Sequence, residues 1–316
     1  MLTGLGGYVL GVLLLVLGSD SLLKGAAGLA LNAGMRPARV GVVVIGFGSG
    51  LVALAINVAA MAGGNPGVAL GNVVGGNVAF IGLVLGVAAL VRALDVTFAL
   101  AHWLLPLLIG ACVLLLALGF DLELGRYDAF VLIAAFLLVF GLTWWRAAYE
   151  SEPVQRAFAE GVETQRDPGR TAIRLVVGAA VLAGGAYLVA ATTAALASAW
   201  GIAPTTAGLS FAAIASALPV LASAAFSAWR GHGDLALAAA LGAGLVNLTL
   251  GLGICALYGP LQPAALAINA PAMLVFALAL YPMLRSDACL TSSEGGTLLA
   301  AWGIYLAWQV FLAAPG

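Results

Sequence analysis

Long apolar runs recur along the whole sequence, and they limit the chain to one broad class of fold. About 20 consecutive apolar residues suffice for a helix that crosses a bilayer. Ten such runs occur, at residues 5–31, 39–62, 68–91, 98–119, 127–147, 172–198, 205–229, 234–257, 265–284 and 296–313. Only 8% of the residues are charged, whereas a soluble domain needs far more charge to cover its surface. The sequence therefore predicts an all-α polytopic membrane protein with ten transmembrane helices.

The two halves of the sequence are related at a fixed offset of 167 residues. At this offset Pro37 pairs with Pro204 and Ser49 pairs with Ser216, and several Gly and Leu pairs accompany them. Matches between Gly or Leu residues arise easily by chance in such a composition, so the Pro and Ser pairs carry most weight. The pattern predicts an internal repeat.

One polar connection, at residues 148–171, divides the predicted spans into two sets of five. We expect a first membrane repeat at residues 1–147, this linker, and a second membrane repeat at residues 172–316. Because each repeat has an odd number of spans, the second repeat should insert with the opposite orientation. Such inverted-topology five-helix repeats are typical of secondary transporters that bind their substrate near the middle of the membrane.

Basic residues gather on one side of the predicted membrane. The connections after alternate spans hold Arg36, Arg39, Arg92, Arg146, Arg156, Arg166, Arg170, Arg174, Arg230 and Arg285. The opposite side holds only Arg126. By the positive-inside rule, the linker is cytoplasmic and both termini lie outside. The expected location is a bacterial-type inner membrane.

Glycine clusters and amide side chains interrupt the apolar character of residues 41–90. Lipid cannot hydrogen-bond such groups, so they are tolerated at membrane depth only where they face protein or a polar cavity. Polar side chains lie within the second, third, seventh and eighth spans, namely Ser49, Asn57, Asn72, Asn77, Ser210, Ser216, Ser223 and Asn247. They either pack helices together or offer neutral oxygens to a ligand, and the sequence leaves both interpretations open.

Asp20 is the one acidic residue that lies well inside a predicted span. Lys24 follows it at i+4 on the same helical face, which favours an ion pair that neutralises both charges. Ionisable groups within a membrane are also functional candidates. The second interpretation of Asp20 is therefore a proton or cation relay.

The sequence lacks the patterns of common enzyme active sites. It contains no phosphate loop, no nucleophile constellation and no HExxH motif, and its three cysteines lack metal-ligand spacing. A net charge of −1 gives no attraction to nucleic acid. We expect no enzymatic activity, no cofactor and no nucleic-acid partner, while the sequence leaves the metal and the oligomeric state unknown.

Four segments resemble signature motifs of the cation/calcium exchanger superfamily, the sodium/calcium exchanger-like membrane proteins. Residues 64–77, GNPGVALGNVVGGN, resemble GNPxLALGNVVGSNIFN, and residues 234–247 resemble DLALGNVVGSNIFN. Residues 47–51 and 214–221 resemble FGTSLPEL and IGTSLPEL. The resemblance covers nearly the whole chain, and the first-half match is the more specific.

This resemblance implies ten helices in two inverted repeats, with ions bound at mid-membrane between the signature helices. It implies antiport of sodium (or protons) against calcium or another cation across the lipid bilayer. Carried over by position, the implied ion ligands are Ser49, Asn72, Asn77, Ser216 and Asn247.

Departures from the signatures are concentrated at the implied site. The two signature glutamates are Ala53 and Val220, and the last Asn of the first signature is Phe80. Ala239 and Gly244 replace both amides in the second half. Calcium takes about six to eight oxygen ligands, usually including several carboxylates, and neutral oxygens offset only part of the desolvation of a divalent ion. These residues favour a monovalent cation or a neutral polar solute over ordinary calcium binding.

The sequence thus predicts a secondary-active antiporter of the sodium/calcium exchanger type that works by alternating access, with its ion selectivity open. The alternative is a degenerate, non-transporting membrane protein with a structural or regulatory role on the same scaffold, which the loss of both carboxylates favours. A carrier of small organic solutes is a third possibility that no residue specifically supports.

Overall fold

The computed structural model describes residues 2–96, 101–121, 123–147, 167–259, 261, 266–286 and 288–313. Within these ranges the chain is almost entirely helical. Most of the predicted linker, residues 148–166, lies outside the described residues.

The first half contains α1 (Leu2–Asn32), α2 (Pro37–Gly41), η1 (Val42–Phe47), η2 (Gly48–Gly50), α3 (Leu51–Ala62), α4 (Pro66–Ala79), η3 (Phe80–Leu85), α5 (Gly86–Val91), β1 (Leu94–Asp95), α6 (Ala101–Leu118), η4 (Gly119–Asp121) and α7 (Arg126–Arg146). The second half contains α9 (Pro168–Trp200), α10 (Pro204–Ala207), η5 (Gly208–Ala212), α11 (Ala213–Trp229), α12 (Gly233–Leu245), η6 (Val246–Gly251), α13 (Leu252–Tyr258), α14 (Leu266–Ser286), β2 (Cys289–Leu290) and α15 (Ser292–Ala313). β1 and β2 pair antiparallel, with Leu94 opposite Leu290.

The offset of 167 residues recurs in the structure, element by element. It maps α1, α4, α6 and α7 onto α9, α12, α14 and α15 to within a few residues. Even the π-helical turns repeat, since η3 maps onto η6 with a shift of one residue. The predicted internal repeat is therefore confirmed.

Six helical stretches in the described part of the chain are long and apolar enough to cross a membrane. They are Gly4–Asn32, Pro66–Val91, Arg126–Arg146, Pro168–Trp200, Pro204–Trp229 and Gly233–Tyr258. Shorter apolar helices lie at Gly48–Ala62, Trp103–Leu118 and Asn269–Leu284. The predicted count of ten spans stays a prediction.

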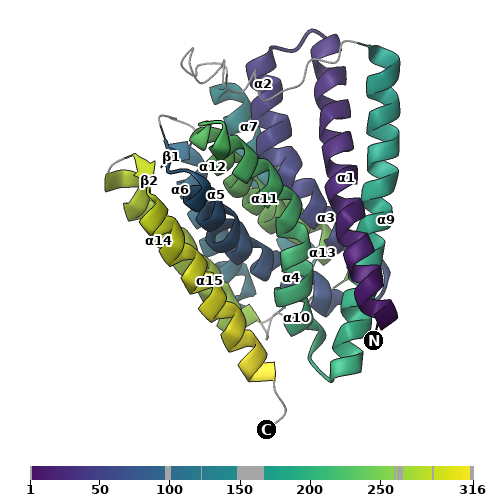
Figure 1. Ribbon diagram of the computed structural model, residues 1–316. Helices are drawn as coiled ribbons and strands as arrows, with labels where there is room; N and C mark the ends of the chain where they lie inside the picture. The colour runs from purple at the N-terminus through teal and green to yellow at the C-terminus, as the bar shows by residue number, and fades with distance from the viewer. Residues whose placement is uncertain are drawn as a thin grey trace.

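α1 and α9 form a long antiparallel pair at one side of the molecule (Figure 1). A Cβ on Gly4 would meet the Leu196 side chain, whereas a Cβ on Gly25 would lie 2.5 Å from the backbone N of Leu175. Between these ends, a Cβ on Gly18 would lie 2.5 Å from the backbone N of Leu182. The two backbones thus approach as closely as glycine permits, as in other membrane helix pairs with small interface residues.

Gly18→Val is expected to lower the thermal unfolding midpoint of the detergent-purified protein by several degrees. The added side chain would collide with backbone atoms of α9, and these cannot relieve the clash by a change of rotamer. Such overpacking typically costs about 1–3 kcal/mol. Gly184→Val is the matched control, because a Cβ on Gly184 of α9 meets no atom within 4 Å. Equal midpoints for the two variants would contradict the close contact.

α4 and α12 occupy the centre of the bundle. Most residues of the spans Pro66–Val91 and Gly233–Tyr258, which contain these two helices, are buried, whereas most residues of α7 are not. Glycines allow the surrounding helices to approach closely, since a Cβ on Gly75 would lie 2.7 Å from Leu209 Cα. The pattern explains why these helices are apolar on all sides and rich in small residues.

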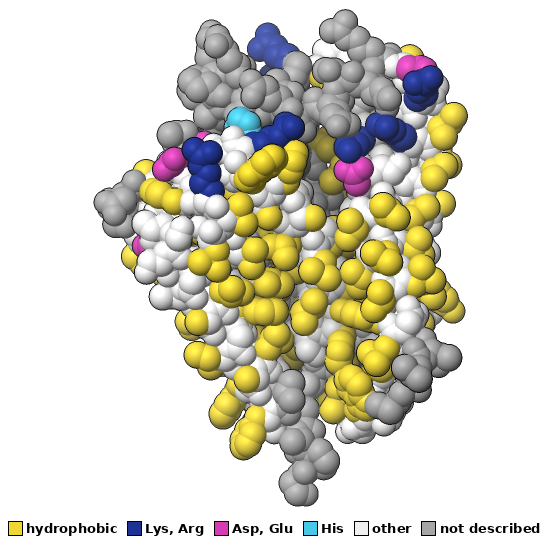
Figure 2. Space-filling view, viewed as in Figure 1, with side chains coloured by type: hydrophobic (Ala, Val, Ile, Leu, Met, Phe, Trp, Pro, Cys, Tyr) yellow, Lys and Arg dark blue, Asp and Glu magenta, His cyan; other side chains and the backbone are white. Residues whose placement is uncertain are grey.

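Charged side chains gather at one end of the molecule, on the face shown in Figure 2, above a broad hydrophobic surface. α1 begins and α15 ends at the opposite end (Figure 1). Large apolar side chains such as Leu17, Val176 and Ile304 are exposed on the outer helices. A hydrophobic outer surface of this kind is typical of contact with the lipid core of a bilayer, so the chain is an integral membrane protein.

Candidate functional site

Three asparagines from both repeats form a hydrogen-bonded chain in the centre of the bundle. Asn72 Nδ2 in α4 donates to Asn57 Oδ1 in α3 at 2.7 Å, and Asn57 Nδ2 donates to Asn247 Oδ1 in η6 at 2.8 Å. Asn247 Nδ2 donates to the backbone carbonyls of Asn72 and Val73 at 3.2 and 3.1 Å. All three side chains are completely buried.

The backbone carbonyls fix the direction of this chain. Because Asn247 Nδ2 faces two acceptors, its Oδ1 must accept from Asn57, and Asn57 Oδ1 must accept from Asn72. Asn72 Nδ2 also faces the Ala53 carbonyl at 3.3 Å. Asn72 Oδ1 is consequently left as a buried acceptor without a hydrogen-bond donor.

The unpaired Asn72 oxygen lies beside Gly76, where polar atoms from both repeats meet. A Cβ on Gly76 would lie 3.0 Å from Asn247 Nδ2, 3.4 Å from Ser216 Oγ and 3.7 Å from Asn72 Oδ1. Ser216 Oγ donates to the Ala213 carbonyl at 2.9 Å, so its lone pairs stay available. An acceptor oxygen and a hydroxyl oxygen thus face the space that a side chain at position 76 would fill.

The other two predicted ligands, Ser49 and Asn77, do not face the space beside Gly76. Ser49 Oγ lies 2.8 Å from each of two backbone carbonyls, those of Gly46 and Ala239. Asn77 Nδ2 donates to the Val73 carbonyl, which also accepts from Asn247 Nδ2, and the unpaired Asn77 Oδ1 faces Gly244. The structure therefore brings together Asn72, Ser216 and Asn247, with Asn77 joined to Asn247 through the shared Val73 carbonyl, while Ser49 bonds to other carbonyls.

Asn57 is part of the chain but is absent from the predicted ligand set. It was recognisable as an amide inside an apolar span, yet it matches no signature position. Its contact with Asn247 depends on the missing side chain of Gly251, where a Cβ would lie 3.0 Å from Asn57 Nδ2. The amide inside an apolar span was the only signal for Asn57 in the sequence, because its contact with Asn247 is set by the packing of the two repeats.

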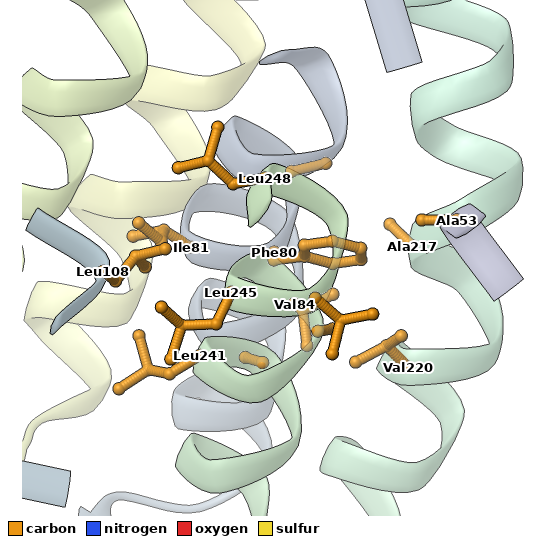
Figure 3. Close-up of a cluster of buried hydrophobic side chains, with 14 of the residues drawn as sticks. Ala53, Phe80, Ile81, Val84, Leu108, Ala217, Val220, Leu241, Leu245 and Leu248 are labelled. Carbon is orange, nitrogen blue, oxygen red and sulfur yellow. The ribbon is translucent and has the colours of Figure 1, made fainter. Parts of the chain in front are cut away.

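The symmetry-related side of the centre is apolar. At the repeat offset, Asn57, Asn72 and Asn247 correspond to Ala224, Ala239 and Phe80. Figure 3 shows the Phe80 ring extending from η3 toward Ala217 in α11 and Ala53 in α3, with Val84 and Val220 close by. These side chains are at most 1% exposed. The positions of the two missing glutamates, Ala53 and Val220, are therefore part of a packed apolar cluster.

A cavity of about 590 Å³ reaches this apolar side from the charged end of the molecule. Arg230 and His232 line it near that end, and Ser49 and Val220 line it toward the centre. The residues of the amide chain are not among its lining residues. In this conformation the cavity thus stops short of the amide chain.

Asp20 and Lys24 line the same cavity from α1 and form an ion pair with an Nζ–Oδ2 distance of 3.1 Å. The Asp20 side chain is 60% exposed. The predicted ion pair is therefore confirmed, and Asp20 belongs to the cavity wall rather than to the amide chain.

The side chains gathered around Gly76 can bind a cation only through neutral oxygens. In the described part of the chain, no cluster of three or more His, Cys, Asp or Glu side chains could hold a metal ion. Without a carboxylate, the charge of a bound ion stays uncompensated. This cluster of side chains therefore suits a monovalent cation better than a divalent one.

A family model described as "Sodium/calcium exchanger protein" matches residues 3–145 and 171–311, which is most of both halves. The putative antiporter CaxA of Alkalimonas amylolytica is 27% identical to this chain, covering 87% of it and 88% of that protein. The inner membrane protein YrbG of Escherichia coli is 29% identical, covering 85% of each. The sodium/calcium exchanger MaX1 of Methanosarcina acetivorans is 26% identical, covering 96% and 97%.

Among solved structures, the sodium-calcium exchanger NCX_Mj, soaked with Na⁺ and Sr²⁺, superposes with a TM-score of 0.69. It is 24% identical and covers 97% of this chain and 98% of its own. This similarity establishes the fold. Together with the family match over both repeats, it confirms the resemblance seen in the signature motifs, and the chain belongs to the sodium/calcium exchanger protein family.

Proposed function

We propose that this protein is a secondary-active cation antiporter that works by alternating access at a mid-membrane site. The family transports sodium and calcium across the lipid bilayer, and it is a family of transporters rather than enzymes. The proposed site comprises Asn72 Oδ1 and Ser216 Oγ, with Asn57 as a supporting amide. Asn247 is proposed as an ion ligand only in a conformation that frees its Oδ1, which here accepts from Asn57. Ser49 and Asn77 are proposed as further ion contacts in another conformation.

The proposed architecture is ten transmembrane helices in two inverted repeats, at residues 1–147 and 172–316, joined by a cytoplasmic linker. The antiparallel packing of α1 against its repeat counterpart α9 supports the inversion. The gathering of charged side chains at one end supports that end as cytoplasmic. With an even number of spans, both termini would lie outside, in a bacterial inner membrane.

The observation that carries the proposal is the unpaired, buried Asn72 oxygen at a junction of both repeats. A buried acceptor without a donor costs free energy, about 1–3 kcal/mol in typical proteins. A passing cation would satisfy it, and a rocking motion of the two repeats would expose it alternately to the two sides.

The direct test is ion uptake into proteoliposomes with an imposed sodium gradient. Labelled sodium and labelled calcium are measured in parallel, beside protein-free liposomes. Gradient-driven uptake of either ion, lost in a variant without the Asn72 amide, would support the proposal. Absence of uptake of any cation by folded protein would favour the alternative, a non-transporting protein on this scaffold, for which the apolar Phe80 cluster is the supporting observation.

Asp20→Asn is expected to lower cation uptake roughly tenfold or more, the scale of electrostatic guidance in charged clefts. The cavity would keep the positive charges of Lys24 and Arg230 and lose its carboxylate. The double variant Asp20→Asn with Lys24→Gln separates two roles in the same uptake assay. Recovery would mean that the pair only balances charge, continued loss would indicate a relay through Asp20, and wild-type uptake in the single variant would exclude both.

A further inference from the structure

We propose that the central site takes a single monovalent cation of the sodium class and that Phe80 is the residue that sets this limit. The inference rests on the proposed site at the amide chain, but not on transport. It concerns what the site binds and how many ions it holds.

The first step concerns charge. Of the three atoms nearest to the space beside Gly76, Ser216 Oγ and Asn72 Oδ1 are oxygens that can contact a cation, whereas Asn247 Nδ2 is a hydrogen-bond donor, and none carries a formal charge. The cost of removing an ion from water rises with the square of its charge, so a divalent ion needs carboxylates that this space lacks. A monovalent ion is the class that neutral amide, hydroxyl and carbonyl oxygens coordinate in membrane proteins.

The second step concerns the number of ions. Equivalent positions of the two repeats would give two symmetry-related sets of oxygens, but only one set exists. At the repeat offset, the counterpart of Asn72 is Ala239, and the counterpart of Asn247 is Phe80. Ser49, the counterpart of Ser216, instead lies 2.8 Å from the Ala239 backbone carbonyl. The second half-site therefore has no side-chain amide.

The third step concerns space. The Phe80 ring is 1% exposed and extends toward Ala53 and Ala217, with Val220 close by (Figure 3), so we infer that it fills the volume of the missing half-site. Ala53 and Ala217 are small, and a shorter side chain at position 80 would leave a gap between them. Phe80 thus excludes both a second ion and the water that would accompany it.

Phe80 also separates the cavity from the polar group. The cavity ends at Val220 and Ser49, on the apolar side, and the amide chain lies beyond the cluster that Phe80 fills. A hydrophobic barrier of this kind resists wetting and keeps ions out until the surrounding helices move. The same ring that limits the site to a single ion therefore also closes it in this conformation.

The test counts bound ions on detergent-purified protein, by equilibrium binding of labelled sodium at constant ionic strength with choline as the replacement cation. The wild type is expected to bind a single sodium ion per chain without cooperativity, and excess calcium should not displace it. Phe80→Asn copies the residue type of Asn247 and is expected to add a second, weaker sodium site. Phe80→Leu also shortens the side chain but supplies no oxygen, so it is the matched control and is expected to retain a single ion.

Gly76→Ala provides a second variant that does not disturb the Phe80 cluster. Its methyl group would enter the space between the three polar atoms, and sodium affinity should fall roughly tenfold or more. Gly141→Ala in α7 is its control, because a Cβ there meets no atom within 4 Å. Displacement of sodium by calcium, two sodium ions on the wild type, or no sodium binding at all would each overturn the inference.

These outcomes are separate from those of the uptake assay. Sodium binding without flux would remove the antiporter and leave this inference standing. Calcium flux by the wild type would support the antiporter and overturn the single monovalent ion.

Discussion

Asn72→Ala is expected to reduce sodium uptake roughly 10- to 100-fold, the scale of losing one hydrogen-bonding group to a charged ligand. The substitution removes the unpaired oxygen proposed as an ion ligand. It also removes the donor to Asn57 Oδ1, which would become a buried acceptor without a partner. The uptake of labelled sodium by proteoliposomes measures the effect, normalised to the amount of inserted protein.

Asn65→Ala is the matched control for this loss. Asn65 precedes the same helix, α4, and its amide bonds locally to the Gly63 carbonyl at 2.9 Å. Uptake by this variant should equal that of the wild type. If Asn72→Ala also takes up sodium at the wild-type rate while remaining folded, the amide chain is structural and the ion path lies elsewhere.

The second large effect concerns the two positions at which the exchanger signatures have glutamate. Ala53→Glu combined with Val220→Glu is expected to lower the unfolding midpoint strongly and to give no high-affinity calcium binding. Both side chains would enter the apolar cluster around Phe80, and an unpaired buried carboxylate costs several kcal/mol on the usual scale of about 3–5.

Adding Phe80→Asn to this double variant is expected to reverse both outcomes in the presence of calcium. The shorter amide makes room and supplies an oxygen opposite Asn247, so the two carboxylates would have an ion to neutralise them. Calcium should then raise the unfolding midpoint of the triple variant by several degrees and leave that of the wild type unchanged. The variant with Phe80→Leu in place of Phe80→Asn is the control, and equal calcium responses in the two would show that position 80 does not contribute a ligand.

Helix positions and the internal repeat could be predicted from the sequence because they depend on local hydropathy and on a constant offset. The π-helical turns at η1, η3, η5 and η6 could not, because their extra residue per turn is selected by contacts with neighbouring helices rather than by local sequence. Their recurrence in both halves shows that the contacts themselves are repeated.

The site could be predicted only in part, for a related reason. Motif positions indicated Asn72, Ser216 and Asn247, and the offset showed that Phe80 replaces an amide. Neither could show the direction of the amide chain, which is fixed by two backbone carbonyls. Neither could show that Ser49 bonds to a backbone carbonyl of the opposite repeat, since that contact joins residues far apart in the chain.

The division of the centre into an amide half and an aromatic half also bears on how the two repeats depend on each other. A homodimer built from two copies of the first repeat would carry Asn57 and Asn72 twice but would place Phe80 at both positions where the chain needs Asn247. A homodimer of the second repeat would have Asn247 twice and neither of its amide partners. Each half therefore lacks the group that completes the other, so the amide chain forms only where both repeats are present together.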